Sequence, residues 1–254
     1  MIVKIKAYLG LFVFLCFSSV VSSIELQQHE ATYTAKIKKG VSIDGSATRS
    51  LKKLDDSRWL YRFDVESFIA DIKEKSVLSF ENGRVVPEEY NYKLSAFLMS
   101  DRKRNIKFNW QNKIAENPLK KGWRLNGIPE NTYDRLSYQL QLLLDVNQGK
   151  ETIKYQIAHK GKLRESQFVI LGEEVLETKF GKLNSIVAKK QRDEDAKRET
   201  YLWFSSDYPL LLLRMTQKEK DGEEYEIILS SAEINGEKID LSKNAVTSTA
   251  QGEI

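Results

Sequence analysis

The sequence predicts a predominantly antiparallel β fold with one amphipathic helix, and three observations support this class. Apolar and polar residues alternate over many short segments, as is typical of strands with one buried face. Asp-Gly and Asn-Gly pairs separate several of these segments, and such pairs favour tight hairpins because they adopt positive φ at low cost. One segment near the middle of the chain changes to helical spacing.

The expected strands are identified by the residues that share a face. In Arg58–Ser67, large apolar side chains occupy every second position and charged side chains lie between them. Short amphipathic strands joined by hairpins predict an antiparallel sheet or barrel rather than a parallel α/β fold. The alternating positions are Ala31, Tyr33, Ala35 and Ile37; Trp59, Tyr61, Phe63 and Val65; Ile106, Phe108 and Trp110; Ile153, Tyr155 and Ile157; and Tyr225, Ile227 and Leu229. The predicted turns are Asp44-Gly45, Asn82-Gly83, Asp221-Gly222 and Asn235-Gly236.

The helical segment is predicted over Tyr133–Asn147. Asn131 or Thr132 is placed to cap its start, and Gly149 lies near its end. Leu136, Leu140, Leu143 and Leu144 follow helical spacing, so we expect one long helix that covers the sheet with a buried leucine stripe. Further on, Leu210–Leu213 predicts a strand that is buried on both faces, after a loop over Ser205–Pro209.

The N-terminus has the three-part pattern of an export signal. Lys4 and Lys6 precede the apolar run Ala7–Val21, which ends in small residues, so cleavage is expected after Ser23. The run is short against the roughly 20 residues that span a membrane, which favours cleavage over an uncleaved anchor. Lipidation at Cys16 is the third alternative. We therefore expect a periplasmic protein without a membrane-spanning segment after cleavage.

Composition and motifs exclude several classes of function. Cleavage would remove two lysines and lower the net charge from +4 to +2. The basic residues are dispersed along the chain, whereas a nucleic-acid-binding protein needs a concentrated basic surface. Removal of Cys16 would leave no cysteine. Two distant histidines give no metal-ligand spacing, and nucleophile, phosphate-binding and dinucleotide motifs are missing from the sequence. We expect no catalytic residue, no metal, no cofactor and no enzyme activity.

Aromatic residues supply the positive signal. The chain has 4 Trp, 11 Tyr and 11 Phe, many on the apolar faces of expected strands, and a curved sheet of this kind under a leucine-striped helix could enclose an apolar ligand. Core packing is the alternative explanation for each residue singly. The candidate ligand-binding residues are Trp59, Tyr61, Phe63, Phe108, Trp110, Leu136, Leu140 and Leu143.

The order of several short motifs resembles a known family. The motifs are Tyr33 with Gly40; Ser79–Gly83 leading to Pro87 and Tyr90; Arg104–Trp110; Tyr133–Ser137; Glu177–Leu183; and Arg198–Pro209. On these residues the chain resembles, from about residue 30 to 240, the bacterial family catalogued as domain of unknown function 3108, exported proteins of undefined role. Asn109 stands where the family pattern has an Asp before the Trp. The resemblance implies a strongly curved antiparallel sheet, an incomplete barrel similar to the LolA/LolB-like lipoprotein carriers, and no catalytic residue.

Together these observations predict three segments: a signal peptide at 1–23, one β domain at 24–241 and a flexible tail at 242–254. The expected function is non-enzymatic binding or carriage of an apolar ligand in the periplasm, such as a lipid or a lipoprotein acyl chain. The alternative is a structural or protein-interaction module of the cell envelope, whose partner is another envelope protein. Neither reading involves nucleic acid.

Overall fold

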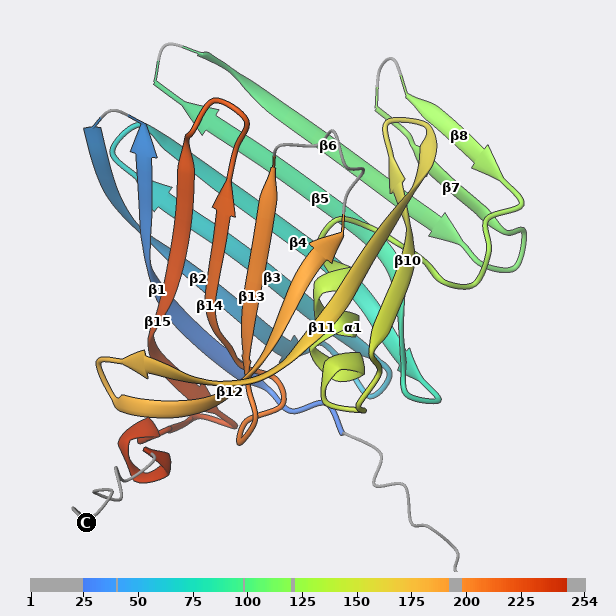
Figure 1. Ribbon diagram of the computed structural model, residues 1–254. Helices are drawn as coiled ribbons and strands as arrows, with labels where there is room; N and C mark the ends of the chain where they lie inside the picture. Colours follow the sequence, from blue (N-terminus) through green and yellow to red (C-terminus); the bar gives the residue numbers. More distant parts are fainter. Residues whose placement is uncertain (1–24, 40, 98, 120–121, 192–197, 246–254) are drawn as a thin grey trace, which may run out of the picture.

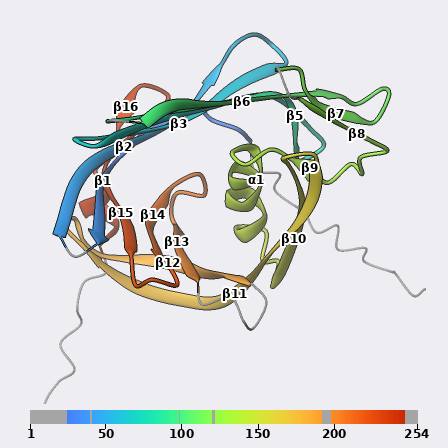
Figure 2. The same cartoon turned by 90° about the horizontal axis from the view of Figure 1, so that it is seen from above.

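The computed structural model describes residues 25–39, 41–97, 99–119, 122–191 and 198–245. In this part of the chain, 16 strands form one sheet that curves around the single α-helix (Figures 1 and 2). The N-terminal strands are β1 His29–Lys39, β2 Val41–Lys53, β3 Arg58–Ser67, β4 Ala70–Glu81, β5 Arg84–Ala96, β6 Met99–Asn109, β7 Ile114–Asn117 and β8 Trp123–Asn126. The C-terminal strands are β9 Thr132–Tyr133, β10 Thr152–His159, β11 Lys162–Thr178, β12 Gly181–Gln191, β13 Glu199–Ser205, β14 Leu212–Lys218, β15 Glu224–Ile234 and β16 Glu237–Lys238.

The strand order divides the sheet into two wings that meet at one seam. The order runs β8 to β1 and then β15 to β9, so that β1 pairs with β15, while β16 pairs only with β15. All pairs are antiparallel except β9 with β10, which run parallel. The prediction of a mainly antiparallel, curved and open sheet is therefore confirmed.

Three of the four predicted turns lie between strands. Asn82 and Gly83 both have positive φ (52° and 78°) between β4 and β5, as a tight primed turn requires. The prediction for Asp44-Gly45 is wrong, because both residues pair with β1 inside β2. A Cβ on Gly45 would lie 2.6 Å from the carbonyl oxygen of Glu66 in β3. Gly45 is therefore a strand glycine that permits close approach of a neighbouring backbone.

The helix differs from the prediction in length and place. Helix α1 spans Ser137–Val146, ten residues, and is not a long cover over the sheet. It lies inside the ring of strands (Figure 2). Tyr133 belongs instead to β9, where it pairs with Ile157. The amides of Leu136 and Ser137 donate to Asp134 Oδ1 at 2.7 and 2.8 Å, so Asp134 satisfies the start of the helix rather than Asn131 or Thr132.

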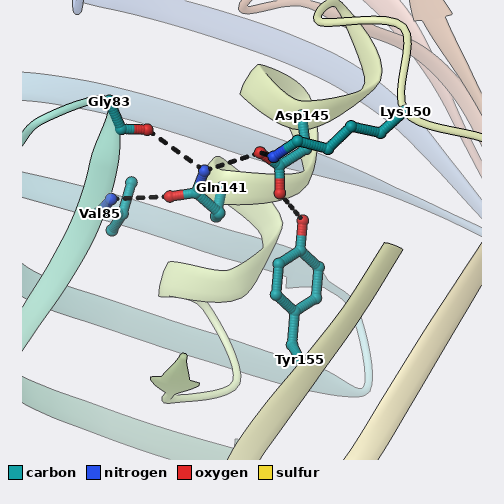
Figure 3. Close-up of polar contacts among 6 residues, drawn as sticks. All are labelled: Gly83, Val85, Gln141, Asp145, Lys150 and Tyr155. Atoms are coloured by element: carbon teal, nitrogen blue, oxygen red, sulfur yellow. Dashed lines mark hydrogen bonds and ion pairs between the residues drawn. The ribbon is translucent and has the colours of Figure 1, made fainter. Parts of the chain in front are cut away.

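Two polar side chains of α1 connect the wings. Gln141 accepts a hydrogen bond from the Val85 amide of β5 (2.7 Å), and its Nε2 donates to Asp145 Oδ1 (3.0 Å) (Figure 3). Asp145 Oδ2 accepts from the Tyr155 hydroxyl of β10 at 2.7 Å, and Oδ1 receives Lys150 Nζ at 2.5 Å. Because the order of strands leaves β8 and β9 as the two ends of the sheet, α1 joins the wings where no ladder does.

The leucines of α1 and its N-cap residue, Leu136, are part of the core. Leu136, Leu140 and Leu143 are fully buried, together with apolar side chains from both wings. The four residues Leu210–Leu213 are all buried as expected, but β14 begins only at Leu212, and the first two belong to the preceding loop. A packed apolar core therefore joins α1 to both wings.

The predicted segment boundaries are only partly within the described residues. The signal peptide at 1–23 lies outside them, as do residues 246–254 of the expected tail. The beginning of that tail overlaps a 3-10 helix, η1 Leu241–Asn244, whose Leu241 is buried. Among the described residues, no helix has the length and hydropathy needed to cross a membrane.

Candidate functional site

A row of charged and aromatic side chains crosses the inner face of the N-terminal wing. The strand register places Arg49, Phe63, Glu74, Tyr92 and Arg104 side by side on β2 to β6. We call these five residues the waist row. The Arg49 guanidinium carbon lies 4.9 Å from the centre of the Phe63 ring, and that of Arg104 lies 4.9 Å from Tyr92. The row alternates cation, ring, acid, ring and cation, so each arginine rests on an aromatic face.

The acid of the waist row is held by the neighbouring row. Tyr90 donates its hydroxyl to Glu74. Burial raises the pKa of Glu74, and the hydrogen bond from Tyr90 and the charge of Arg135 offset this only in part. Asp134 lies close by and accepts from Ser76 Oγ at 2.7 Å; burial raises its pKa as well. Both carboxyl groups already have hydrogen-bond donors within the protein.

A pocket of about 820 Å³ lies on the inner side of the C-terminal wing, between α1 and β10 to β12. Tyr138 and Ile157 give it an aromatic and an aliphatic surface. Among the described residues of its lining, the one carboxylate is Glu165, which forms an ion pair with Lys154 at 3.6 Å. The cationic side chains on its described lining are Arg135, Arg164, Lys190 and Arg198, of which Arg198 is paired with Glu219 at 2.5 Å. Its wall is therefore predominantly cationic.

The pKa of His159 reports the charge of this region. Burial, together with the charges of Arg135, Arg104 and Arg164, lowers it to about 4. Arg104 belongs to the N-terminal wing and Arg164 to the C-terminal wing, so cations from both wings act on one imidazole. Arg104 Nη1 is buried without a hydrogen-bond partner among the described residues. A positive field of this kind attracts anions into the interior.

Arg49 is the deepest cation of the waist row and is 4% exposed. Its Nη2 donates to Gln139 Oε1 of α1 at 2.8 Å, and its Nε has no partner within the described chain. Tyr138, which lines the pocket, interacts electrostatically with Arg49. The waist row and the pocket therefore meet at the start of α1.

The eight residues predicted to bind ligand occupy two kinds of place. Tyr61, Leu136, Leu140 and Leu143 are fully buried in the core. Trp59, Phe63, Phe108 and Trp110 are partly buried and pack against that core, and the Trp110 indole donates to the Pro87 carbonyl oxygen at 2.7 Å. None of the eight lines the 820 Å³ pocket, although Phe63 belongs to the waist row. Their role in ligand binding stays a prediction.

Sequence reasoning missed the charged residues of the interior, although a signal for them exists. Arg49 shares the inner-face phase of β2 with Ala47 and Leu51, and Arg104 shares that of β6 with Ile106. A charge at an apolar phase of a strand is unusual, since buried charges are costly unless they are paired. As for metals, no group of three His, Cys, Asp or Glu within the described ranges could hold an ion.

The model of the family described as "Protein of unknown function (DUF3108)" matches residues 30–229. The chain belongs to this family. Among curated proteins, none matches this DUF3108 protein. The resemblance that the sequence motifs indicated is thereby confirmed.

Solved structures add information on the fold of the DUF3108 protein. A beta-barrel-like protein of domain of unknown function DUF1849 from Brucella abortus superposes with a TM-score of 0.56 at 9% identity, over 83% of this chain and 99% of that one. A DUF1329 family protein from Desulfovibrio piger has a TM-score of 0.30 at 10% identity, over 85% of this chain and 88% of that one. This TM-score is too low to indicate a shared fold. The first match supports a barrel-like fold and no specific activity. The expected LolA/LolB-like architecture is not confirmed.

Proposed function

We propose that this protein is a non-enzymatic binding protein that holds a small amphiphile, an acyl chain with an anionic group, inside the open barrel. The observation that supports it is the 820 Å³ pocket, whose described lining residues include four cations, Arg135, Arg164, Lys190 and Arg198, and one carboxylate. This volume lies in the range of small-molecule binding sites. Its polar lining fits an anionic group better than a purely apolar molecule. The export pattern at 1–23 supports a periplasmic place of action.

An apolar row provides a surface for the acyl chain. Next to the waist row, the register aligns Ala47, Val65, Ile72 and Leu94 across β2 to β5 on the inner face. Each buried CH₂ group contributes about 0.8 kcal/mol, so roughly ten methylenes contribute on the order of 8 kcal/mol before the cost of ordering. Binding by this surface and the basic wall requires no catalytic group.

The direct test has two arms. Protein purified without detergent is extracted and examined by mass spectrometry, and the emptied protein is titrated with dodecanoate and with dodecyltrimethylammonium. We expect an extracted anionic amphiphile and tighter binding of dodecanoate, because both probes share the chain and differ in charge. Arg164→Glu should weaken dodecanoate binding, whereas Lys238→Glu on exposed β16 makes the same change in net charge away from the pocket. Equal binding of the two probes, or none, would contradict the proposal.

An exposed apolar patch favours a second candidate function, docking of an envelope protein. Phe68 is 96% exposed and Phe97 is 79% exposed, at the ends of two neighbouring hairpins. The Phe97 amide donates to the carbonyl oxygen of Ile69, which is 42% exposed, at 3.0 Å, so the backbone segments that carry these three exposed residues lie next to each other. Exposed apolar groups that cluster in this way mark interaction surfaces. A photocrosslinker at Phe68 should capture one envelope protein, and one at exposed Leu54 should not; capture at neither position would refute docking.

A further inference from the structure

Four polar atoms around Arg49 lack hydrogen-bond partners among the described residues, although all four are buried. They are Arg49 Nε, the hydroxyls of Tyr33 and Tyr61, and His29 Nε2. Buried polar groups are nearly always paired, and a group that is not needs an explanation such as a bound ligand. Four such atoms at one place on the inner face are the clearest anomaly of this fold.

The strand register shows that these groups surround one point. Arg49 pairs with Ala31 of β1, so it lies between His29 and Tyr33, which flank Ala31 on the same face. On its other side, the Arg49 guanidinium carbon is 5.8 Å from the centre of the Tyr61 ring. Donors from β1, β2 and β3 therefore converge beneath the start of α1.

Arg49 has no carboxylate partner in the described part of the chain. Its Nη2 donates to the neutral Gln139 Oε1, and the side chain of Tyr61, also neutral, is its other hydrogen-bonding neighbour. Glu74, the acid of the waist row, is two strands away in the register and already accepts from Tyr90. A buried guanidinium without a counter-ion is costly, because desolvation is not repaid by a nearby opposite charge.

The neighbouring hydroxyls are suited to donate to an anion. Burial raises the pKa of Tyr33 and of Tyr61, so both remain protonated at neutral pH. Burial lowers the pKa of His29 to about 4, which keeps its ring neutral. Its Nδ1 donates to the Gln27 carbonyl oxygen at 3.1 Å, so Nε2 is an acceptor and is not one of the donors of this centre. The centre thus presents one positive charge and two O–H donors.

We propose that Arg49, Tyr33 and Tyr61 form an anion-binding centre that takes the carboxylate of the bound amphiphile. The assignment rests on the proposed function and names the chemical class of its ligand. A carboxylate matches a single guanidinium in charge, and its two oxygens fit the planar fork of N–H donors. A phosphate dianion would bring more negative charge than this one cation neutralises.

The surroundings of Arg49 provide a route to this centre. Phe63 and Gln139, two of the side chains that contact the guanidinium, are both half-buried, so Arg49 is one side chain away from the interior surface. A carboxylate that replaces the Gln139 carboxamide exchanges a neutral acceptor for a charged one, which strengthens the hydrogen bond. The more exposed cations of the pocket wall attract the anion, and Arg49 binds it.

The experiment measures dodecanoate, dodecanol and dodecyl phosphate binding to wild type and to Arg49→Met by calorimetry. Wild type should bind dodecanoate more tightly than the other two. Arg49→Met should lose about thirty-fold in dodecanoate affinity, the effect of one hydrogen bond to a charged group, and should keep its dodecanol affinity. Arg214→Met is the matched control, because Arg214 also lies over a ring, that of Trp203 at 5.0 Å, but pairs with Glu226 on the outer face. Arg214→Met should leave the affinities for all three probes unchanged.

A second pair of measurements covers the case in which Arg49→Met does not fold. Tyr33→Phe and Tyr61→Phe keep the ring and remove one hydroxyl each, and both should weaken dodecanoate but not dodecanol. Acetate, the smallest probe, should raise the unfolding temperature of wild type more than that of the variants. Equal dodecanoate affinity in wild type and all folded variants, or tighter binding of dodecyl phosphate, would overturn the assignment. Equal binding of dodecanol and dodecanoate in every variant would refute the anion-binding centre but still support a binding site for an acyl chain. If neither probe binds and acetate has no effect, both the centre and the proposed function are refuted.

Discussion

Asp145→Ala should be among the most destabilising single substitutions in this chain. The carboxylate receives the Tyr155 hydroxyl at 2.7 Å, Gln141 Nε2 at 3.0 Å and Lys150 Nζ at 2.5 Å. Two buried hydrogen bonds to a charged acceptor contribute about 1.5–3 kcal/mol each. The Lys150 side chain is 48% exposed, so its ion pair adds at most about 1 kcal/mol. The expected loss in the free energy of unfolding is therefore about 4 kcal/mol.

Urea unfolding followed by circular dichroism measures this loss. Tyr155→Phe should cost about 1.5–3 kcal/mol, since it removes one of the hydrogen bonds and leaves the others in place. The double variant should lose less than the sum of the two single losses, because both substitutions remove the same contact. Asp101→Ala, which removes an exposed partner of Lys93, serves as the control and should leave the unfolding midpoint unchanged. A loss for Asp145→Ala no larger than that of the control would refute the role of α1 as the connection between the wings.

Three further substitutions test other parts of the structure. Gly161→Ala should destabilise more than Gly127→Ala, by about 1 kcal/mol, because both glycines have positive φ but only at Gly161 would a Cβ meet a side chain, Trp123 Cβ at 3.1 Å; equal melting temperatures would contradict this. The folded-state pKa of His29 is lowered to about 4, so the unfolded chain binds the proton first as pH falls below its ordinary pKa. Stability should drop by roughly 3 kcal/mol from about pH 7 to about pH 4 on account of this residue, and His29→Gln should flatten that part of the pH profile measured by urea unfolding. Glu74→Gln should stabilise the protein at neutral pH and not at pH 4, because burial raises the pKa of Glu74 and its ionisation opposes folding as pH rises; equal gains at both values would exclude this explanation.

Most of the strands and turns could be predicted from local patterns in the sequence. The predicted strand Arg58–Ser67 has the bounds of β3, because alternation and a following turn define both of its ends. Asn82-Gly83 specified a hairpin for the same local reason. The turn predicted at Gly45 was wrong, because a glycine that permits close approach of a neighbouring strand cannot be told from a turn glycine until the neighbour is known. The helix was overestimated because Tyr133 follows its apolar spacing but pairs with β10.

The candidate site could be predicted from the sequence only in small part, because its residues are brought together by strand pairing. The alternation marks Arg49 and Arg104 as charges at apolar strand positions, but only the pairing of β2 through β6 aligns them with Glu74. Arg135 and Tyr138 reach the same interior because α1 lies inside the ring, which periodicity does not specify. The aromatic signal indicated the inner face through Phe63 but could not separate core from pocket.

The seam between β1 and β15 sets an order of events for the newly made chain. His29 pairs with Ile234, and the Asn235 amide donates to the Gln28 carbonyl oxygen at 2.8 Å. The first described strand, β1, is therefore paired with β15, the last but one. Contacts so distant in sequence form late, because the intervening chain must lose its freedom first. Until β15 arrives, β1 has an unpaired edge, which is a template for association with other chains. A nascent chain therefore cannot complete its ring before its C-terminal strands are made, and premature termination would release molecules with an open β1 edge.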